Sequence, residues 1–509
     1  MNLSTILYQI SKDKSKEMAL IEEDKYLSYN KLWNDIEKLA KAFWKIGLKK
    51  DDKVAVILPN CKEFILSFFA LLRIDAIAVP LKPAFTAFEL KEIFQDCSPV
   101  AIISTPSFLD KVVHEDEELL DRRIVIALGR TDNSLNSRWE KFFTFGQLYE
   151  IGKDENLPEN TKKNNQIASI NYTYRGYGYP LGVVLSHDNY YHSATAFKNL
   201  LKPLSVNCAL LFLPMAHIFS MVGSIIFPLS MGATIVIVNS IIPSHIFRTI
   251  DEFQVDYILG TPTIYSIFLK NYNKEKYRLD SIRHAISGGS FLPMELHHRV
   301  KEAMGLSLMQ GYGLTECVPA ICNALGSKKI HSLGVSWNDN VEIKIVDEND
   351  RQLPANKTGE ILIKGPVVMD KYYGKKEITD QVIKDGWFYT GDYGRLDEDG
   401  YLYFEGLKKK IIKIGGNTVD LKEVEKVLLT HPAVCAVKLY AKSDSLWGHL
   451  LTAEIFLESN RDIQEKDIKS FCKERIASYK IPKTIIIDNK YRETGQGPSD
   501  CARRASESV

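Results

Sequence analysis

The 509-residue chain lacks an excess of charge of either sign. Its 65 lysine and arginine residues nearly balance 64 aspartate and glutamate residues, which leaves a net charge of +1 at pH 7. A protein that binds nucleic acid needs a basic surface to hold the phosphates. The balance therefore argues against a nucleic-acid partner, and a hydrophobic content of 45% is typical of a folded globular protein.

Cysteine pairs with the spacing of a metal site or a disulfide framework are also missing. The eight cysteines are scattered without a CxxC pair. Residues 1–17 have no basic segment before their short apolar stretch, so they do not resemble a secretory signal. We expect a cytoplasmic protein with reduced cysteines. The eight are Cys61, Cys97, Cys208, Cys317, Cys322, Cys435, Cys472 and Cys501.

Charged side chains are missing from Pro203 to Phe247, although a quarter of the whole chain is charged. A membrane-spanning helix needs about 18 or more consecutive apolar residues. Pro214, Gly223 and Pro228 interrupt the stretch before that length is reached, and no cluster of lysine or arginine flanks it. We therefore expect no integral membrane segment.

Short apolar and β-branched runs recur at helix-sized intervals along the first half of the chain. Such alternation predicts an α/β fold with largely parallel sheets that are covered on both faces. The runs begin at Val54, Ala76, Val100, Ile124, Leu210 and Thr234.

The pattern changes twice further along. Alternating apolar and polar residues near 341–345 and 360–365 predict antiparallel hairpins. Beyond about residue 406, helical spacing over 421–429 and 463–477 and strand-like runs at 434–440 and 451–457 predict a small α+β domain.

Three short motifs carry groups suited to nucleotide binding. In QGYGLTE, which starts at residue 310, Tyr312 offers a flat face for a base, Thr315 a hydroxyl for phosphate and Glu316 a carboxylate for a hard cation. In YTGD, Asp392 follows a glycine and is suited to ribose hydroxyls. The segment 287–290 (SGGS) offers backbone to a purine. The first motif is equally typical of a turn before a capped helix, and the second of an Asx-type turn.

The order and spacing of these motifs resemble those of the adenylate-forming superfamily, which includes acyl-CoA synthetases, aryl-CoA ligases, luciferases and peptide-synthetase adenylation domains. QGYGLTE is followed by YTGD and then by GLKKKIIKIGGNTVDLKEVE. LPMAHIFSMVG, SGGSFLP and SYKIP also match motifs of that family. The resemblance covers nearly the whole chain.

The resemblance implies a fold and its boundaries. Residues 1–405 would form a large N-terminal domain, with α/β parts at 1–165 and 166–326 and a β-barrel at 327–405. Residues 406–410 would be a hinge, and 411–509 a small mobile α+β domain.

The resemblance also implies a reaction. ATP and Mg²⁺ would convert a carboxylic acid to acyl-AMP with release of pyrophosphate, and coenzyme A would then take the acyl group. His217 and the uncharged residues after it would line the acid. Amino-acid-activating relatives have an aspartate near His217, so its apolar neighbours favour a fatty acid first and an aromatic acid second. An acyl carrier protein is the alternative acceptor.

The family's functional residues carry over position by position. The phosphate loop would include Thr173, Gly178 and Gly182, and the catalytic set would be Thr315, Glu316, His217 and Lys413. Glu316 would bind the magnesium ion. Lys409 would be the hinge residue, and Lys413 and Gly416 would face the thiol. The remaining nucleotide-binding positions would be Gly288, Gly289, Tyr312, Gly313 and Asp392.

The chain departs from the family pattern at two expected lysines. Leu181 stands in the phosphate loop and Pro498 near the C-terminus, where each lysine would stabilise developing charge. Arg175 could restore a cation to the loop or lie on the surface, and Arg503 or Arg504 could replace the second lysine. The remaining alternatives are a C-terminal tail out of register and a catalytically impaired nucleotide- or acyl-binding homologue.

Overall fold

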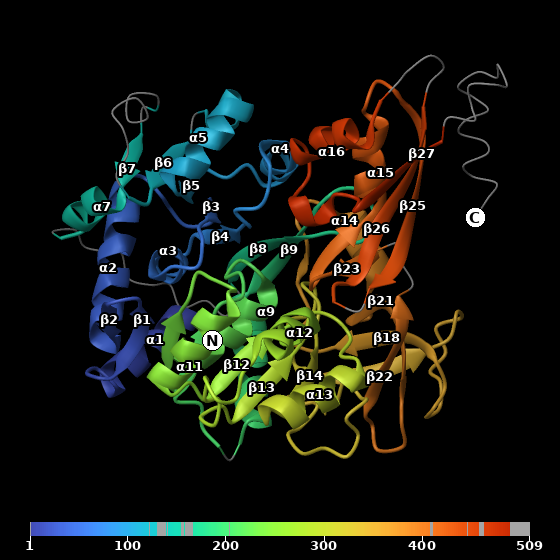
Figure 1. Cartoon of the computed structure of the whole chain (residues 1–509). Helices are drawn as coiled ribbons and strands as arrows, with labels where there is room; N and C mark the ends of the chain where they lie inside the picture. Colours follow the sequence, from blue (N-terminus) through green and yellow to red (C-terminus); the bar gives the residue numbers. More distant parts are fainter. Residues whose placement is uncertain are drawn as a thin grey trace. The chain divides into compact units, whose positions relative to one another are not determined.

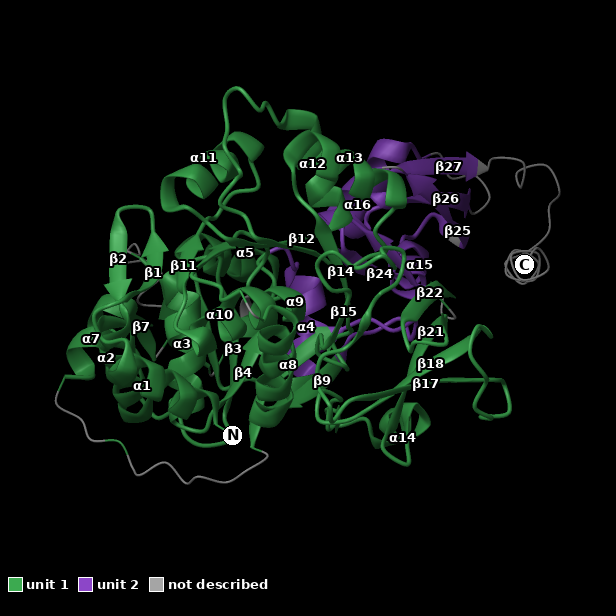
Figure 2. Cartoon of the chain, turned by 90° about the horizontal axis from the view of Figure 1, so that it is seen from below, with its two compact units in different colours: residues 1–83, 96–172, 182–408 green, residues 84–95, 173–181, 409–509 purple. Residues whose placement is uncertain are grey.

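The computed structural model describes residues 2–121, 123–129, 139, 141–153, 157, 166–202, 204–407, 411–444, 446–457 and 463–488. Helices and strands alternate along the first half, as predicted (Figure 1). The contacts divide the chain into two compact units, coloured separately in Figure 2. Unit 1 comprises residues 1–83, 96–172 and 182–408, and unit 2 comprises 84–95, 173–181 and 409–509. The domain boundaries inferred from the resemblance stay a prediction.

Unit 1 contains an eight-stranded sheet with the order β19-β9-β8-β4-β3-β5-β6-β7. Strands β3 to β6 pair in parallel and their residues are almost all buried, which explains their continuous apolar runs. The strands are β3 (Lys53–Ile57), β4 (Ile77–Pro80), β5 (Ala101–Ser104), β6 (Ile124–Ala127), β7 (Phe142–Thr144), β8 (Ile167–Thr173), β9 (Leu181–Ser186) and β19 (Lys371–Tyr372).

The helices between these strands follow from local sequence signals. The helix α5 begins after Thr105, whose side chain accepts from the amide of Phe108, with a proline in its first turn. These helices are α2 (Tyr29–Lys45), α3 (Lys62–Arg73), α4 (Ala87–Cys97), α5 (Pro106–Glu115), η1 (Glu117–Leu120) and α7 (Phe145–Ile151).

A nine-stranded sheet in unit 1 has the order β16-β15-β14-β13-β12-β10-β11-β1-β2. Strands β10 to β14 are parallel, so their carboxyl ends meet at one edge of the sheet. The strands are β1 (Met18–Glu22), β2 (Lys25–Ser28), β10 (Cys208–Leu211), β11 (Thr234–Ile237), β12 (Tyr257–Gly260), β13 (His284–Ser287), β14 (Leu308–Tyr312), β15 (Ile321–Cys322) and β16 (Val335–Ser336). The accompanying helices are α1 (Leu3–Asp13), α8 (His187–Leu200), α11 (Pro243–Phe253), α12 (Pro262–Asn271) and α13 (Met294–Met304).

The described part of the uncharged stretch contains β10, β11, three short helical pieces and the beginning of α11. These pieces are α9 (Ile218–Ser220), the π-helical turn η2 (Met221–Ile226) and α10 (Phe227–Met231). Gly232 ends α10 with a φ of 71°, which glycine adopts without strain. Across the described residues, no helix combines the length and apolar character needed to cross a membrane.

Unit 1 also holds the predicted hairpins. Strand β17 (Glu342–Val346) pairs with β18 (Gly359–Lys364) in antiparallel fashion. The region expected as a β-barrel is a five-stranded antiparallel sheet. The other members are β20 (Ile383–Lys384), β21 (Trp387–Leu396) and β22 (Leu402–Leu407), and α14 (Lys376–Val382) precedes β20.

The described part of residues 411–488 of unit 2 forms a five-stranded sheet with the α-helices α15 and α16, and the α+β prediction for this region is confirmed. An apolar core forms between the sheet and the helices, including Val419, Val424 and Ile468. The elements are β23 (Ile411–Ile414), β24 (Asn417–Asp420), α15 (Leu421–Leu429), β25 (Val434–Asp444), β26 (Gly448–Leu457), α16 (Glu465–Lys473), η3 (Ser478–Lys480) and β27 (Thr484–Asp488). Helix α16 (Glu465–Lys473) is shorter than the predicted helix over 463–477. It ends because Glu474 takes the C-cap position and the chain turns after it.

The side chains of six of the cysteines are described by the structure, and all six are free thiols. Five of these are buried, and Cys208 is half-buried. The five buried residues are Cys61, Cys97, Cys317, Cys322 and Cys472.

Candidate nucleotide and acyl site

The adjacent strands β13 and β14 bring the residues predicted to hold adenine to one edge of the sheet. Ser287 on β13 pairs with Gln310 on β14, so the segments after both strands leave the sheet side by side. Gly288 and Gly289 follow β13, and Tyr312 ends β14. In α/β proteins, ligands bind outside the carboxyl ends of parallel strands. This edge is therefore the candidate nucleotide site.

Tyr312 is hydrogen-bonded to Asp392, the carboxylate predicted to hold ribose. The Tyr312 hydroxyl donates to Oδ2 of Asp392 at 2.7 Å. The amide of Asp392 in turn donates to the hydroxyl of Thr390 at 3.1 Å, which fixes the backbone there. Burial, followed by the charge on Asp392, raises the pKa of Tyr312 well above its ordinary value. The phenol therefore stays protonated and orients the carboxylate.

Glu316, the predicted magnesium ligand, is buried in unit 1. The hydroxyl of Tyr372 donates to its Oε1 at 2.7 Å. The preceding Thr315 is half-buried, and a Cβ on Gly313 would lie 2.7 Å from Cα of Pro319, so that turn needs glycine. Mg²⁺ is commonly held by one or two carboxylates together with substrate phosphates, so a single buried glutamate suits it. The described residues contain no cluster of three or more metal-ligating side chains.

His217 lies at the start of α9 and shapes the wall beside Gly288. Its Nδ1 accepts a hydrogen bond from the amide of Phe219 at 3.3 Å, so the imidazole caps this short helix. The Phe219 ring lies directly against Gly288, because a Cβ there would be 2.6 Å from Cζ of the ring. Glycine at 288 is therefore required by packing.

Phe219 also lines a small apolar cavity. Its volume is about 10 Å³, and its walls include Phe219, Ile286, Gly311, Ala320 and Trp337. That volume is about the minimum for one water molecule. A bulky acyl group would enter only if a side chain such as Trp337 or Phe219 turned away.

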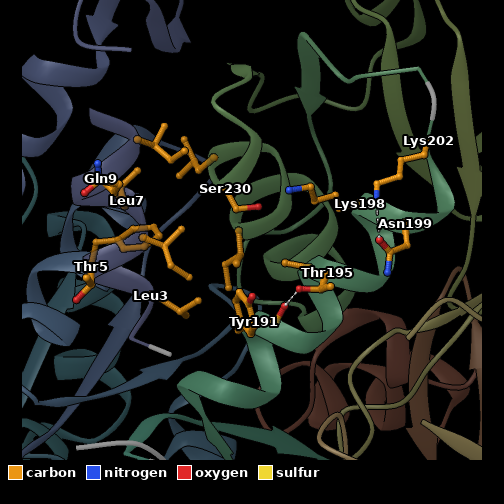
Figure 3. Close-up of a pocket in the computed structure, with 16 residues that line it drawn as sticks. Leu3, Thr5, Leu7, Gln9, Tyr191, Thr195, Lys198, Asn199, Lys202 and Ser230 are labelled. Carbon is orange, nitrogen blue, oxygen red and sulfur yellow. Dashed lines mark hydrogen bonds between the residues drawn. The ribbon is translucent and has the colours of Figure 1, made fainter. Parts of the chain in front are cut away.

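A second cavity, of about 570 Å³, lies on the opposite face of α8 (Figure 3). Leu3 and Leu7 of α1 contribute apolar walls, while Lys198 and Lys202 lie at the other side of the view. Residues 191, 194, 195, 198 and 199 of α8 face this cavity, whereas 196, 197 and 200 face the smaller one. Ile226, Leu229 and Ser230, from the uncharged stretch after His217, also line this cavity, but none of the residues predicted to bind the nucleotide is among its described lining residues.

Residues 173–181 of the predicted phosphate loop belong to unit 2, whereas Gly182 belongs to unit 1. Gly176 and Gly178 have φ angles of 83° and 79°, and their amides both donate to Oδ2 of Asp420, at 2.8 and 3.1 Å. Arg175 is buried, so its interpretation as a surface residue is wrong. The loop amides thus converge on a carboxylate of the same unit.

The strands that flank this loop explain two other positions. Thr173 ends β8, and Leu181 begins β9 with its side chain fully buried. A Cβ on Gly182 would lie 2.9 Å from Cγ2 of Ile170, so glycine is needed there for packing within the sheet. Leu181 therefore has the role of a core residue.

The two positions predicted to face the thiol lie in the hairpin of β23 and β24. Lys413 donates through Nζ to the hydroxyl of its cross-strand partner Thr418 at 2.6 Å. Gly415 and Gly416 form the turn with φ angles of 58° and 87°, the left-handed pair that a tight hairpin favours. Lys409, Pro498, Arg503 and Arg504 lie outside the described residues.

Several residues that shape these regions did not stand out in the sequence. Tyr372 lies in a segment without a nucleotide motif. Asp420 lies in the motif GLKKKIIKIGGNTVDLKEVE, but the resemblance assigns it no role. Lys480 lies within the SYKIP motif, and its side chain makes two ion pairs, with Glu89 and Glu423. A fully buried lysine needs paired charges, but sequence alone did not indicate burial.

Comparison with known families agrees with this geometry. The family model described as AMP-binding enzyme matches residues 8–373, and the model of the AMP-binding enzyme C-terminal domain matches residues 423–497. The chain therefore belongs to the adenylate-forming family of AMP-binding enzymes.

Individual relatives differ in the acid that their names specify. The chain is 28% identical over 496 residues to a long-chain-fatty-acid–CoA ligase of Bacillus subtilis, covering 93% of this chain and 88% of the relative. It is 26% identical over 475 residues to a feruloyl-CoA synthase of Amycolatopsis, covering 92% of each. The amide bond synthetase of Marinactinospora thermotolerans shares the fold, with a TM-score of 0.84, 21% identity and coverage of 100% and 99%.

Proposed function

We propose that this chain activates a carboxylic acid with ATP and Mg²⁺ and transfers the acyl group to coenzyme A, with a fatty acid as substrate and the cytoplasm as location. The observation that carries the proposal is the Tyr312–Asp392 hydrogen bond, 2.7 Å long, beside the glycine turn after β13. This pair combines a flat ring for a base with an oriented carboxylate for ribose hydroxyls.

The reaction has two balanced steps. A carboxylate oxygen of the acid bonds to the α-phosphorus of ATP, and pyrophosphate leaves. The sulfur of coenzyme A then bonds to the acyl carbon, AMP leaves, and the thiol proton is released.

Each predicted residue has a role in these steps. Gly288, Gly289 and Tyr312 hold the base, and Asp392 holds the ribose. Thr315 lies beside Glu316, which suits a hydroxyl that contacts the α-phosphate. A magnesium ion held by Glu316 would neutralise phosphate charge.

The remaining predicted residues act around these central groups. Thr173, Gly178 and Gly182 belong to the loop that faces the outer phosphates, and Gly313 keeps the turn before Thr315 tight. His217 borders the acid, and Lys413 and Gly416 face the thiol. Lys409 is the hinge residue about which the small domain rotates between the two steps.

The nature of the walls supports an apolar acid. Phe219, Ile286 and Ala320 line the small cavity with apolar side chains. The imidazole of His217 caps a helix. These four side chains therefore supply no anionic anchor for the ammonium group of an amino acid. The long-chain-fatty-acid–CoA ligase among the relatives supports an alkyl chain, and the feruloyl-CoA synthase supports an aromatic acid as the second choice.

Mass spectrometry of the products tests the proposal. The protein is incubated with ATP, Mg²⁺, coenzyme A and panels of fatty and aromatic acids. We expect acyl-CoA from at least one fatty acid, and pyrophosphate release well above that of Glu316→Gln. Tyr372→Phe, which removes only the hydroxyl that donates to Glu316, serves as the milder comparison. Acyl-adenylate without acyl-CoA would instead support a carrier-protein acceptor.

One observation favours a second function, nucleotide or acyl binding without turnover. Leu181 is a fully buried residue of β9, so the expected lysine is replaced by a core side chain. Loss of a group that stabilises developing charge typically costs about 100-fold or more in rate. ATP binding without pyrophosphate release from any acid of the panel would support this function.

A further inference from the structure

The carboxylate of Asp420 accepts hydrogen bonds from two backbone amides of the predicted phosphate loop. Its Oδ2 accepts from Gly176 N at 2.8 Å and from Gly178 N at 3.1 Å. Its Oδ1 accepts from Lys422 N at 2.9 Å, where Asp420 is the N-cap of α15. The residue is 0% exposed, so these contacts are made away from solvent.

The conformation of the loop explains why an anion binds there. Both glycines adopt the left-handed region, and this turns two nearby amides toward one point. Converging backbone amides form an anion-binding concavity of the kind that holds phosphate. Charge-assisted hydrogen bonds of this type are stronger than neutral ones.

We propose that Asp420 is an internal competitor for the β- and γ-phosphates of ATP at this loop. Binding of the triphosphate requires the carboxylate to leave the amides of Gly176 and Gly178, so Asp420 holds the loop in a closed state. This inference rests on the proposed function only in assigning the loop to ATP. It concerns affinity for phosphate, not the chemical step.

The two oxygens of Asp420 have separable roles. Oδ1 caps α15, and a serine can cap a helix about as well as an aspartate. Oδ2 accepts the hydrogen bonds from the loop amides. A serine side chain is shorter and uncharged, so it cannot place a negative charge there. Asp420→Ser therefore removes the competitor while it keeps the cap.

Calorimetry with the full chain tests the proposal without any acid substrate. The ligands are ATP·Mg²⁺, inorganic pyrophosphate and AMP, which lacks the outer phosphates. An apparent dissociation constant falls when a competing closed state is removed. We expect Asp420→Ser to bind ATP and pyrophosphate about tenfold more tightly, within the range of typical coupling between sites, and AMP about as tightly as the native chain.

Two further variants support the comparison. Asp420→Asn keeps the size of the side chain and removes its charge, so it should also tighten ATP binding. This variant replaces Asp420→Ser in the test if the serine variant unfolds. Asp467 is a carboxylate in the first turn of α16, where it accepts from Gln464 N at 3.0 Å. Asp467→Ser is the matched control and should leave all three affinities unchanged.

Unchanged or weaker ATP binding by both Asp420 variants would overturn the inference. So would an equal gain for AMP, because the effect would then not involve the outer phosphates. Tighter ATP binding by Asp420→Ser with no acyl-AMP formed from any acid would uphold the inference while the proposed function failed.

Discussion

Lys480 and Glu423 form a buried ion pair in unit 2, with 2.6 Å between Nζ and Oε1. Glu89 lies at the same distance from the same ammonium group, so two carboxylates share one lysine. The exposed fractions of the three side chains are 0%, 6% and 2% for Lys480, Glu423 and Glu89. The ring of Tyr174 lies 4.0 Å from the ammonium and adds a cation–π contact.

Removal of the lysine should strongly destabilise unit 2. Lys480→Met leaves two carboxylates buried without their cation, and breaking a buried pair in this way typically costs about 3–5 kcal/mol. Chemical denaturation followed by circular dichroism measures the loss. Lys483→Met, at an exposed position nearby, is the control and should change stability little. A stability loss no larger than that of the control would contradict the structural role of Lys480.

The pH dependence of stability should reveal Glu423. Burial, together with Glu89, raises the pKa of Glu423 from 4.5 to about 7 despite the opposing effect of Lys480. The folded state therefore keeps a proton that the unfolded chain has released. This contribution to stability is complete below about pH 4.5 and is lost as the pH rises to about 7.

Thermal melting between pH 4.5 and 8 checks this prediction. Glutamine imitates the protonated acid, so Glu423→Gln should gain stability relative to the native chain as the pH rises. Glu425→Gln, on the same helix, is the control. A difference between Glu423→Gln and the native chain that stays constant with pH would show that Glu423 titrates normally.

Loss of the Tyr312 hydroxyl should weaken nucleotide binding. A hydrogen bond to a charged group contributes about 1.5–3 kcal/mol, so Tyr312→Phe should raise the KM for ATP by about tenfold with a smaller change in kcat. Tyr403 donates to Asp397 at 3.2 Å, a similar pair outside the predicted nucleotide-binding residues, and Tyr403→Phe is the matched control. Equal KM values for ATP in Tyr312→Phe and Tyr403→Phe would contradict a role of the Tyr312 hydroxyl in nucleotide binding.

A methyl group at position 288 should collide with the neighbouring ring. The backbone there does not require glycine, but a Cβ would lie 2.6 Å from Cζ of Phe219. Overpacking of this kind costs about 1–3 kcal/mol. Gly288→Ala should therefore lower the melting temperature, and Phe219→Leu in the same chain should recover part of the loss. A double-mutant cycle measures the coupling, and additive effects would contradict direct contact.

Patterns within short windows predicted most elements of the fold. The apolar runs at Val54 and Val100 are parallel strands, and the helix expected over 421–429 is α15 with the same bounds. The hairpin near Ile343 is confirmed because alternation reports directly on one buried face.

Contacts between distant residues could not be predicted in this way. Glu89 and Lys480 are 391 residues apart, and Gly178 and Asp420 are 242 apart. No periodicity links such positions, and each side chain alone resembles an ordinary surface charge. The glycine motifs, in contrast, were recognisable because their backbone geometry depends on the local sequence.

The buried thiols make the folded chain its own reporter of local opening. Burial raises the pKa of each of the six described cysteines, for example to about 12 at Cys61 and about 11 at Cys472. Because the thiolate is the reactive form, alkylation of the native protein should be slow at these positions. Cys61 lies before α3 and Cys472 within α16, so the order in which they are alkylated in rising denaturant would show which unit opens first.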